Sequence, residues 1–154
     1  MIPSDLLHLA IRPTLELLGP KYQGRNGERM LIAIAMQESR ITHRRQIGGP
    51  ARGFWQFETG GVAGVLRHRA SKADAERLCE ALNYRPEVSI IHVALEHNDI
   101  LACGFARLLL WTDAAPLPET EEAGWGYYLR NWRPGRPHPS AWPNAWRAAN
   151  EALA

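Results

Sequence analysis

One glutamate lies where a strongly apolar segment gives way to a polar loop, a position that suits acid–base chemistry. Residues Met30–Met36 are apolar on every helical face, which predicts a buried helix with Glu38 in its last turn. Partial burial and the negative end of the helix dipole both disfavour a carboxylate, so Glu38 would stay protonated near neutral pH, as a general acid must. Nearby Arg40, Arg44 and Arg45 would oppose this shift if they reached the carboxyl group. The alternative is that Glu38 only marks the point where the helix reaches solvent.

Two other segments carry groups suited to binding sugars. In the segment 48–58, glycines beside an aromatic pair let the backbone approach a ligand, and Gln56 offers both a donor and an acceptor to a sugar hydroxyl or acetamido group. The segment 127–135 alternates aromatic and hydrogen-bonding side chains, whose rings stack on pyranose faces. The alternative is that these rings pack in the core. We expect core packing for Phe57 and for at least two members of the set Trp125, Trp132, Trp142 and Trp146.

The elements that must position these groups are predicted to be helices, because the dominant apolar period is helical and strict alternation is nearly absent. We expect a polar loop over 41–53, and an extended piece or a helix entry over 54–57. The interruption of the apolar stripe at Asn98 favours a helix boundary capped by Asn98 over a polar group facing a pocket. The expected helices are 5–18 bent at Pro13, one capped by Asn26 that runs to Glu38, one opened by a capping box at Ser71–Asp74, two within 88–109, one carrying Trp125–Trp132, and one carrying Trp142–Leu153.

Composition limits the fold and its partners. A chain of 154 residues with 45% hydrophobic and 22% charged residues predicts one compact all-α domain over 1–154, with at most a small extended element near 41–58. A formal charge of +2 does not indicate a nucleic-acid binder. No apolar run is long enough to cross a bilayer, and the first residues lack the pattern of a secretory signal.

The cysteines and histidines point to no cofactor. Cys79 and Cys103 lie in apolar helical patterns and are predicted to be buried thiols. His92 and His97 are five residues apart and therefore face different sides of a helix. No metal-ligand spacing and no phosphate-binding glycine loop occurs, so we expect neither a metal site nor a cofactor.

Taken in order, these motifs resemble the lysozyme-like superfamily, and within it the soluble lytic transglycosylases related to goose-type lysozyme. That family has an E-S pair after a buried helix, then G-L-M-Q or G-L-W-Q, then Y-N-x-G. The chain has Glu38-Ser39, then Gly53-Phe54-Trp55-Gln56, and later Asn131 with Gly135, while Tyr127 and Tyr128 are displaced from the family position. The resemblance covers roughly residues 28–136. The runs 131–137 and 106–111 are similar to versions of this domain in tailed-phage virion proteins.

The resemblance implies a lyase that cleaves peptidoglycan between N-acetylmuramic acid and N-acetylglucosamine. Glu38 would protonate the glycosidic oxygen and then accept the proton of the muramoyl 6-hydroxyl as an anhydro ring closes. The interval from Ser39 to Phe57 holds no Asp or Glu, which suits a reaction whose nucleophile belongs to the substrate. Glu58 is the first carboxylate after that interval, and its use to activate water would make the protein a hydrolytic muramidase. A third possibility is a non-catalytic virion or assembly module of the same fold.

The implied site and partners follow from the same comparison. Glu38 is the expected catalytic residue, and the expected substrate contacts are Ser39, Phe54, Gln56, Glu58, Tyr128 and Asn131. A basic cluster near Glu38 fits an anionic polymer, either peptidoglycan stem carboxylates or nucleic-acid phosphates, or is simply a solvated loop; its members are Arg40, His43, Arg44, Arg45 and Arg52. We expect glycan strands as the partner and not nucleic acid, phage structural proteins as further partners, and a location in a phage virion or the host cytoplasm with action on the wall in the periplasm.

Overall fold

A computed structural model describes all 154 residues and shows an all-helical chain without strands. This confirms the predicted all-α class. The α-helices are α1 (Pro3–Leu6), α2 (Arg12–Leu18), α3 (Arg25–Ser39), α4 (Thr59–Arg67), α5 (Lys72–Ala81), α6 (Val88–Ala94), α7 (Asp99–Trp111), α8 (Glu121–Trp132) and α9 (Trp142–Leu153), with a π-helical turn at Leu7–Ile11 and 3-10 turns at Pro20–Tyr22 and Pro139–Ala141.

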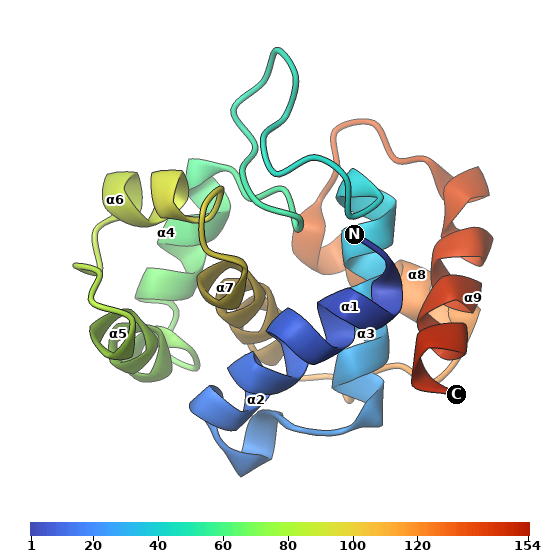
Figure 1. Cartoon of the computed structure of the whole chain (residues 1–154), viewed down its shortest axis with the longest axis horizontal. Coiled ribbons are helices and arrows are strands. Elements are labelled where there is room, and N and C mark those ends of the chain that lie inside the picture. Colours follow the sequence, from blue (N-terminus) through green and yellow to red (C-terminus); the bar gives the residue numbers. More distant parts are fainter.

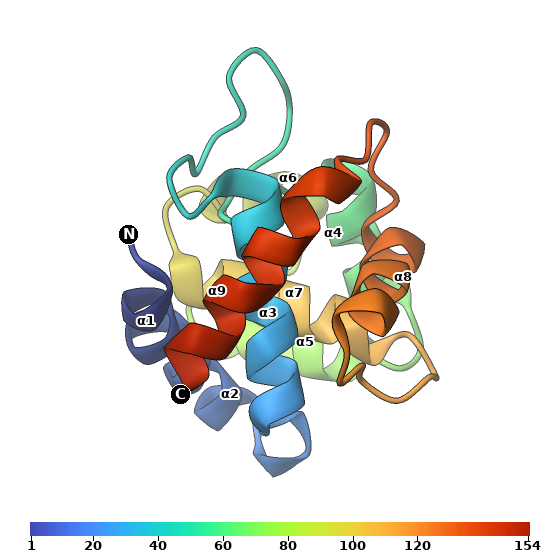
Figure 2. The same ribbon diagram turned by 90° about the vertical axis from the view of Figure 1, so that its right-hand side faces the viewer.

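Helix α3 runs through the middle of the molecule, with α9 packed along it and α7 on another side (Figures 1 and 2). Its residues 30–35 are completely buried. Since these side chains are apolar all round the helix, neighbours on every side can cover them. Packing on all sides therefore fixes the position of α3, and its last turn, which carries Glu38, reaches the surface.

Two loops rise beside the carboxyl end of α3, residues 40–58 and residues 133–138 (Figures 1 and 2). The first contains only two isolated bridges, Arg45 with Arg52 and Arg52 with Phe57, which are the small extended element predicted there. Residues 53–56 form a tight turn between the bridged residues Arg52 and Phe57, so residues 54–56 are neither an extended piece nor a helix entry, and α4 begins at Thr59.

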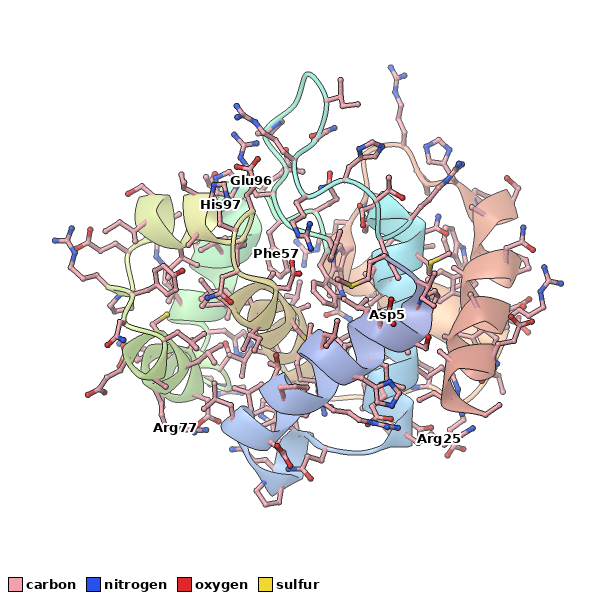
Figure 3. All side chains as sticks on the ribbon, in the orientation of Figure 1. Asp5, Arg25, Phe57, Arg77, Glu96 and His97 are labelled. Atoms are coloured by element: carbon pink, nitrogen blue, oxygen red, sulfur yellow. The ribbon has the colours of Figure 1, made fainter.

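The turn is fixed to the core at both of its ends, by Phe57 and by Gly53. Phe57 is buried, as predicted, inside the molecule in Figure 3, and its carbonyl oxygen lies 3.1 Å from His92 Nε2. Gly53 has φ +79°, and a Cβ there would lie 2.9 Å from the carbonyl oxygen of Leu95. Only glycine fits this position without strain.

The first helical segment is irregular around Pro13. A π-helical turn at Leu7–Ile11 directly precedes α2, in whose first turn Pro13 lies. Proline has no amide hydrogen and crowds the carbonyl four residues earlier, so a regular helix cannot continue through it. The predicted bend therefore takes the form of a π turn.

Two predicted caps are wrong, although the helices they announce are present. Gly24 precedes α3, and Asn26 lies in the first turn, where its side chain accepts from Arg29 and donates to Glu119. Ser71 precedes α5, but its hydroxyl donates to the carbonyl of Val65 and caps nothing. In both places the polar side chain forms its hydrogen bonds with groups other than the free amides at the start of the helix.

The boundary at Asn98 is confirmed: its side-chain oxygen accepts from the amide of Leu101 at 3.0 Å and caps α7. Cys79 and Cys103 are both buried and unpaired, as predicted. None of the helices has the length and apolarity needed to cross a bilayer.

Candidate active site

Glu38 lies in a groove of about 800 Å³ at the carboxyl end of α3. Loop 40–58 forms one side, and the end of α8 with loop 133–138 forms the other. The lining residues are Gln37, Glu38, Ser39, Arg40, His43, Gln46, Ile47, Ala51, Gln56, Glu58, Tyr128, Trp132, Arg133, Pro134, Gly135, Arg136 and His138.

The carboxyl group of Glu38 is held by a tyrosine from a distant part of the chain. The hydroxyl of Tyr128, on α8, donates to Glu38 Oε1 at 2.5 Å. The Tyr128 ring stacks on Trp142 at 5.4 Å between centroids and on Trp132 at 6.3 Å. Because indole rings flank the phenol, its hydroxyl has a fixed direction, and with it the carboxyl group.

Burial raises the pKa of Glu38 to about 7. The hydrogen bond from Tyr128 opposes this increase, because it favours the charged carboxylate, and the negative charge of Glu58 adds to it. Glu38 takes part in no ion pair. The direction agrees with the sequence argument, and a carboxyl group with this pKa is protonated in a large fraction of molecules near neutral pH.

None of the arginines expected to compete for Glu38 forms an ion pair with it. Arg44 forms an ion pair with Asp99 at 2.8 Å, and its guanidinium lies 4.3 Å from the centre of the Phe54 ring.

Burial, followed by the charge of Glu38, raises the pKa of Tyr128 above its usual range. Tyr128 therefore remains a neutral donor at any pH at which Glu38 titrates.

Ser39 lines the groove with its hydroxyl already bonded to the protein, whereas the Phe54 side chain is buried behind the groove. The Ser39 hydroxyl donates to the carbonyl oxygen of Phe54 at 2.7 Å, lies 3.0 Å from that of Ala35, and accepts from the amide of Ile41. The Phe54 side chain is only 1% exposed. The Ser39 hydroxyl joins the end of α3 to the backbone of loop 40–58. The expected substrate contact of Phe54 is wrong, because its side chain is buried and does not line the groove.

Gln56 and Glu58 do line the groove. Gln56 has φ +52°, and its side-chain nitrogen donates to the carbonyl of Gly53 at 2.9 Å, which leaves its carbonyl oxygen without a protein donor. Glu58 is exposed at the groove wall. Trp55, which precedes Gln56 in the chain, is fully buried and donates to the carbonyl of Leu31 in α3.

Asn131 does not reach the groove, so its expected role as a substrate contact is wrong. Its side-chain nitrogen donates to Asp113 at 2.9 Å and to the carbonyl of Tyr127, on the other side of α8. The residue that shares the groove face with Tyr128 is Trp132, one helical turn later. Trp132 is half-buried and donates to the carbonyl of Trp55 at 2.9 Å.

Among the four tryptophans expected to be divided between core and surface, Trp142 and Trp146 are buried in the core. This confirms the prediction that at least two would pack there. Trp125 and Trp132 are half-buried.

The basic rim of the groove was only partly foreseen. Arg40 and His43 from the predicted cluster line the groove, whereas Arg52 donates to carbonyls of its own loop. Loop 133–138 adds a second basic side, with Arg133, Arg136 and His138. The sequence signal for this second basic side is the run of arginines and prolines at 133–138, directly after a predicted helix.

A larger hollow of about 1270 Å³ lies at the other end of α3 and does not contain Glu38. We place the catalytic chemistry in the smaller groove, because a raised carboxyl pKa in a cleft identifies a candidate acid, whereas volume alone does not.

The structure contains no group of three or more metal-ligating side chains. In comparisons with protein-family models, curated proteins and solved structures, none matched the chain. Its function is therefore argued from the site.

Proposed function

We propose that the protein is a peptidoglycan lytic transglycosylase whose single acid–base group is Glu38. The observation that carries this proposal is the combination at one place of a buried carboxyl group with a pKa of about 7, a fixed tyrosine donor on one of its oxygens, and a groove beside it. The resemblance of the Glu38-Ser39 and Gly53–Gln56 motifs to this family supports the same assignment.

The two carboxyl oxygens of Glu38 have different roles, because only one of them accepts a hydrogen bond from the protein. Tyr128 donates to Oε1, so the proton of the neutral acid is carried by Oε2. In the proposed reaction this proton passes to the glycosidic oxygen as the bond to C1 of N-acetylmuramic acid breaks. The resulting carboxylate then takes the proton from the 6-hydroxyl of the same sugar, whose oxygen bonds to C1. Glu38 ends protonated, and the product is an anhydro-muramoyl end.

The charge of the rim fits a strand that carries peptide carboxylates. Arg40, Arg133 and Arg136 line the groove and form no ion pair, while its only acidic lining residues are Glu38 and Glu58. Peptidoglycan stems present carboxylates along a neutral sugar chain, so the strand would place neutral sugars over Glu38 and its charges at the rim.

A hydrolytic muramidase is the second candidate, because Glu58 lines the same groove and its charge acts on Glu38. In that case Glu58 would activate a water molecule on the opposite face of the sugar. A non-catalytic module would be indicated by a buried or ion-paired Glu38 with no open groove beside it. It is less well supported, because Glu38, although buried, lines an open groove and forms no ion pair.

The experiment is digestion of purified peptidoglycan followed by mass spectrometry of the products. Anhydro ends with wild-type protein, their loss in Glu38→Gln, and their persistence in Glu58→Gln are the expected results. Glu16→Gln, an exposed carboxylate on α2, is the matched control. Reducing ends that disappear in Glu58→Gln would replace the lyase by the hydrolase, and full activity of Glu38→Gln would overturn both.

Association with a phage virion or with phage-driven lysis is part of the proposal. It rests on the similarity of residues 106–111 and 131–137 to phage versions of the domain. Phage structural proteins are accordingly proposed as partners in addition to glycan strands.

A further inference from the structure

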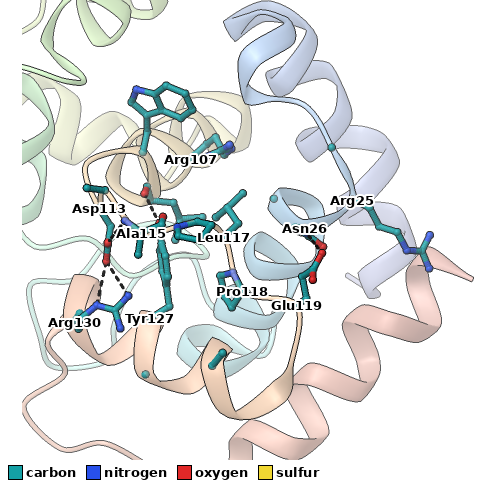
Figure 4. Close-up of a pocket in the computed structure, with 18 of the residues that line it drawn as sticks. Arg25, Asn26, Arg107, Asp113, Ala115, Leu117, Pro118, Glu119, Tyr127 and Arg130 are labelled. Carbon is teal, nitrogen blue, oxygen red and sulfur yellow. Dashed lines mark hydrogen bonds and ion pairs between the residues drawn. The ribbon is translucent and has the colours of Figure 1, made fainter.

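The hollow at the amino end of α3 combines a buried cation with free backbone donors. It is lined by residues 23–27, by Arg107 and Trp111 of α7, by segment 113–120 and by one face of α8, and Figure 4 shows its interior. Since α3 has 15 residues, this hollow and the groove of Glu38 lie about 20 Å apart at opposite ends of the helix.

Arg107 is the unusual group in this hollow. It is only 2% exposed and has no acidic partner. Its Nε donates to the carbonyl of Tyr22 at 3.0 Å, and its guanidinium carbon lies 5.5 Å from the Tyr22 ring centre and 5.7 Å from that of Trp111. Both Nη atoms, four N–H bonds in all, have no hydrogen-bond acceptor in the protein. A buried cation without a counter-charge is costly to keep, and burial lowers the pKa of Arg107 accordingly.

The first turn of α3 faces the same space. No side chain caps it, and the amides of Arg25, Asn26 and Gly27 have no acceptor in the protein. A Cβ on Gly27 would lie 3.3 Å from Arg107 Nε, so the helix end and the guanidinium are adjacent. Free amides at the positive end of a helix dipole, next to a buried guanidinium, are donors suited to an oxyanion.

The other cations around the hollow already have partners in the protein. Arg130 forms an ion pair with Asp113 at 3.1 Å, and Lys21 lies 3.3 Å from Asp74. Arg25 points away from the hollow in Figure 4 and donates to the carbonyl of Leu153. Glu119, exposed at the edge, accepts from Asn26 at 3.2 Å and is the one unpaired carboxylate near the helix end.

We propose that this hollow is a second binding site, for a ligand that carries a carboxylate or phosphate group. The oxyanion would accept from the Arg107 Nη atoms and from the amides at the start of α3, and the rest of the ligand would lie along Trp111 and Leu117. Glu119 would repel the ligand and weaken its binding.

Titration of the full chain with inorganic phosphate and, separately, with acetate tests the proposal, with sodium chloride holding the ionic strength constant. We expect saturable shifts of the backbone amide signals of residues 25–27 and of the Arg107 side-chain signal by NMR. Saturation with phosphate alone identifies a phosphorylated ligand, saturation with acetate alone identifies a carboxylate, and saturation with both supports the shared oxyanion chemistry. Shifts that do not saturate, or that spread over the basic surface, would overturn the site.

Two variants extend the test. Arg107→Gln should weaken binding by roughly tenfold to a hundredfold, as expected for loss of a charge-assisted hydrogen bond. Because Arg107 is buried and this variant can fail to fold, Glu119→Gln at the surface is the second variant. It should tighten binding severalfold, and unchanged or weaker binding in folded Glu119→Gln would contradict the proposed position of the anion.

Discussion

At the scale of the residue, the site depends on the environment of a single carboxyl group. Glu38 is kept from water by the groove walls and oriented by Tyr128, and no arginine neutralises it. Its raised pKa therefore comes mainly from burial. The same burial has a cost in stability that can be measured separately from activity.

Replacing Glu38 by Gln should stabilise the folded protein in alkaline solution. Because the pKa of Glu38 rises on folding from 4.5 to about 7, the folded state binds more protons than the unfolded state between these values. Stability therefore falls as the pH rises through this window, and the cost remains in full above it. Glu38→Gln removes the cost, so its free energy of unfolding should exceed that of wild type by about 1–3 kcal/mol near pH 8 and match it near pH 4.

Urea unfolding of both proteins at the two pH values measures this difference. The glutamine oxygen can still accept from Tyr128, which keeps the comparison matched. Equal stabilities at both pH values would show that Glu38 titrates normally in the folded state.

Removing the tyrosine hydroxyl should move the pH dependence of activity. Tyr128→Phe deletes the hydrogen bond that lowers the pKa of Glu38. The alkaline limb of the pH–rate profile should therefore move to higher pH, while the maximal rate falls. Tyr127→Phe is the neighbouring control, because its hydroxyl donates to the carbonyl of Leu110 away from the groove. A profile shifted equally by both variants would argue against a specific role for Tyr128.

At the scale of the element, the wall of the groove formed by loop 40–58 is fixed by hydrogen bonds to two helices and by a close backbone approach at a glycine. Ser39 and Trp55 join loop 40–58 to α3, and Trp132 joins the same loop to α8. Glycine is required where this loop passes closest to the core. The wall that carries Gln56 and Glu58 should therefore be sensitive to a single methyl group at Gly53.

Gly53→Ala should destabilise the protein more than Gly48→Ala. Both positions have positive φ, +79° and +72°, and both substitutions incur a backbone strain of about 1 kcal/mol. At Gly53 the new Cβ would also meet the carbonyl oxygen of Leu95 at 2.9 Å, whereas nothing lies within 4 Å at Gly48. Thermal unfolding measures the difference, and equal losses for the two variants would contradict the close approach at Gly53.

The helices were predictable because their signals are local. The apolar stretch 30–36, the cap at Asn98 and the aromatic spacing of 125–132 each specify an element from a few neighbouring residues. The wrong caps at Asn26 and Ser71 show the limit, since the Asn26 amide donates to the distant Glu119 and the Ser71 hydroxyl donates to Val65 in the preceding helix.

The site was predictable only in its centre. Glu38 could be found from the end of its apolar helix, but the contact with Tyr128 joins residues 90 positions apart. No periodicity distinguishes Tyr128, which faces the groove, from Asn131, which faces Asp113, until the packing of α8 is known. Ser39 and Phe54 belong to the motif, yet their work is structural.

At the scale of the whole molecule, the groove runs between two loops that bear arginines, with Glu38 between them and Glu58 on one wall. Loop 40–58 and loop 133–138 supply the arginines, and α3 supplies the acid between them. The arrangement should favour a strand that bears stem peptides over one from which the peptides have been removed.

Arg136→Gln should weaken binding to peptide-bearing glycan by up to about fivefold, the effect of one exposed charge, and should leave binding to peptide-free glycan unchanged. Added salt should reduce the difference, because exposed charges are screened. Sedimentation with insoluble peptidoglycan measures it, and Arg67→Gln on α4, outside the groove, is the control. Equal losses on both polymers would assign Arg136 to the sugars instead of the peptides.

The central claim is that Glu38 is an uncharged acid at the pH where the protein works. A ¹³C NMR titration of the Glu38 carboxyl carbon, assigned by comparison with Glu38→Gln, measures this directly. The account predicts a midpoint of about 7. A midpoint near the ordinary value of 4.5 would contradict it, since Glu38 would then have no proton to donate.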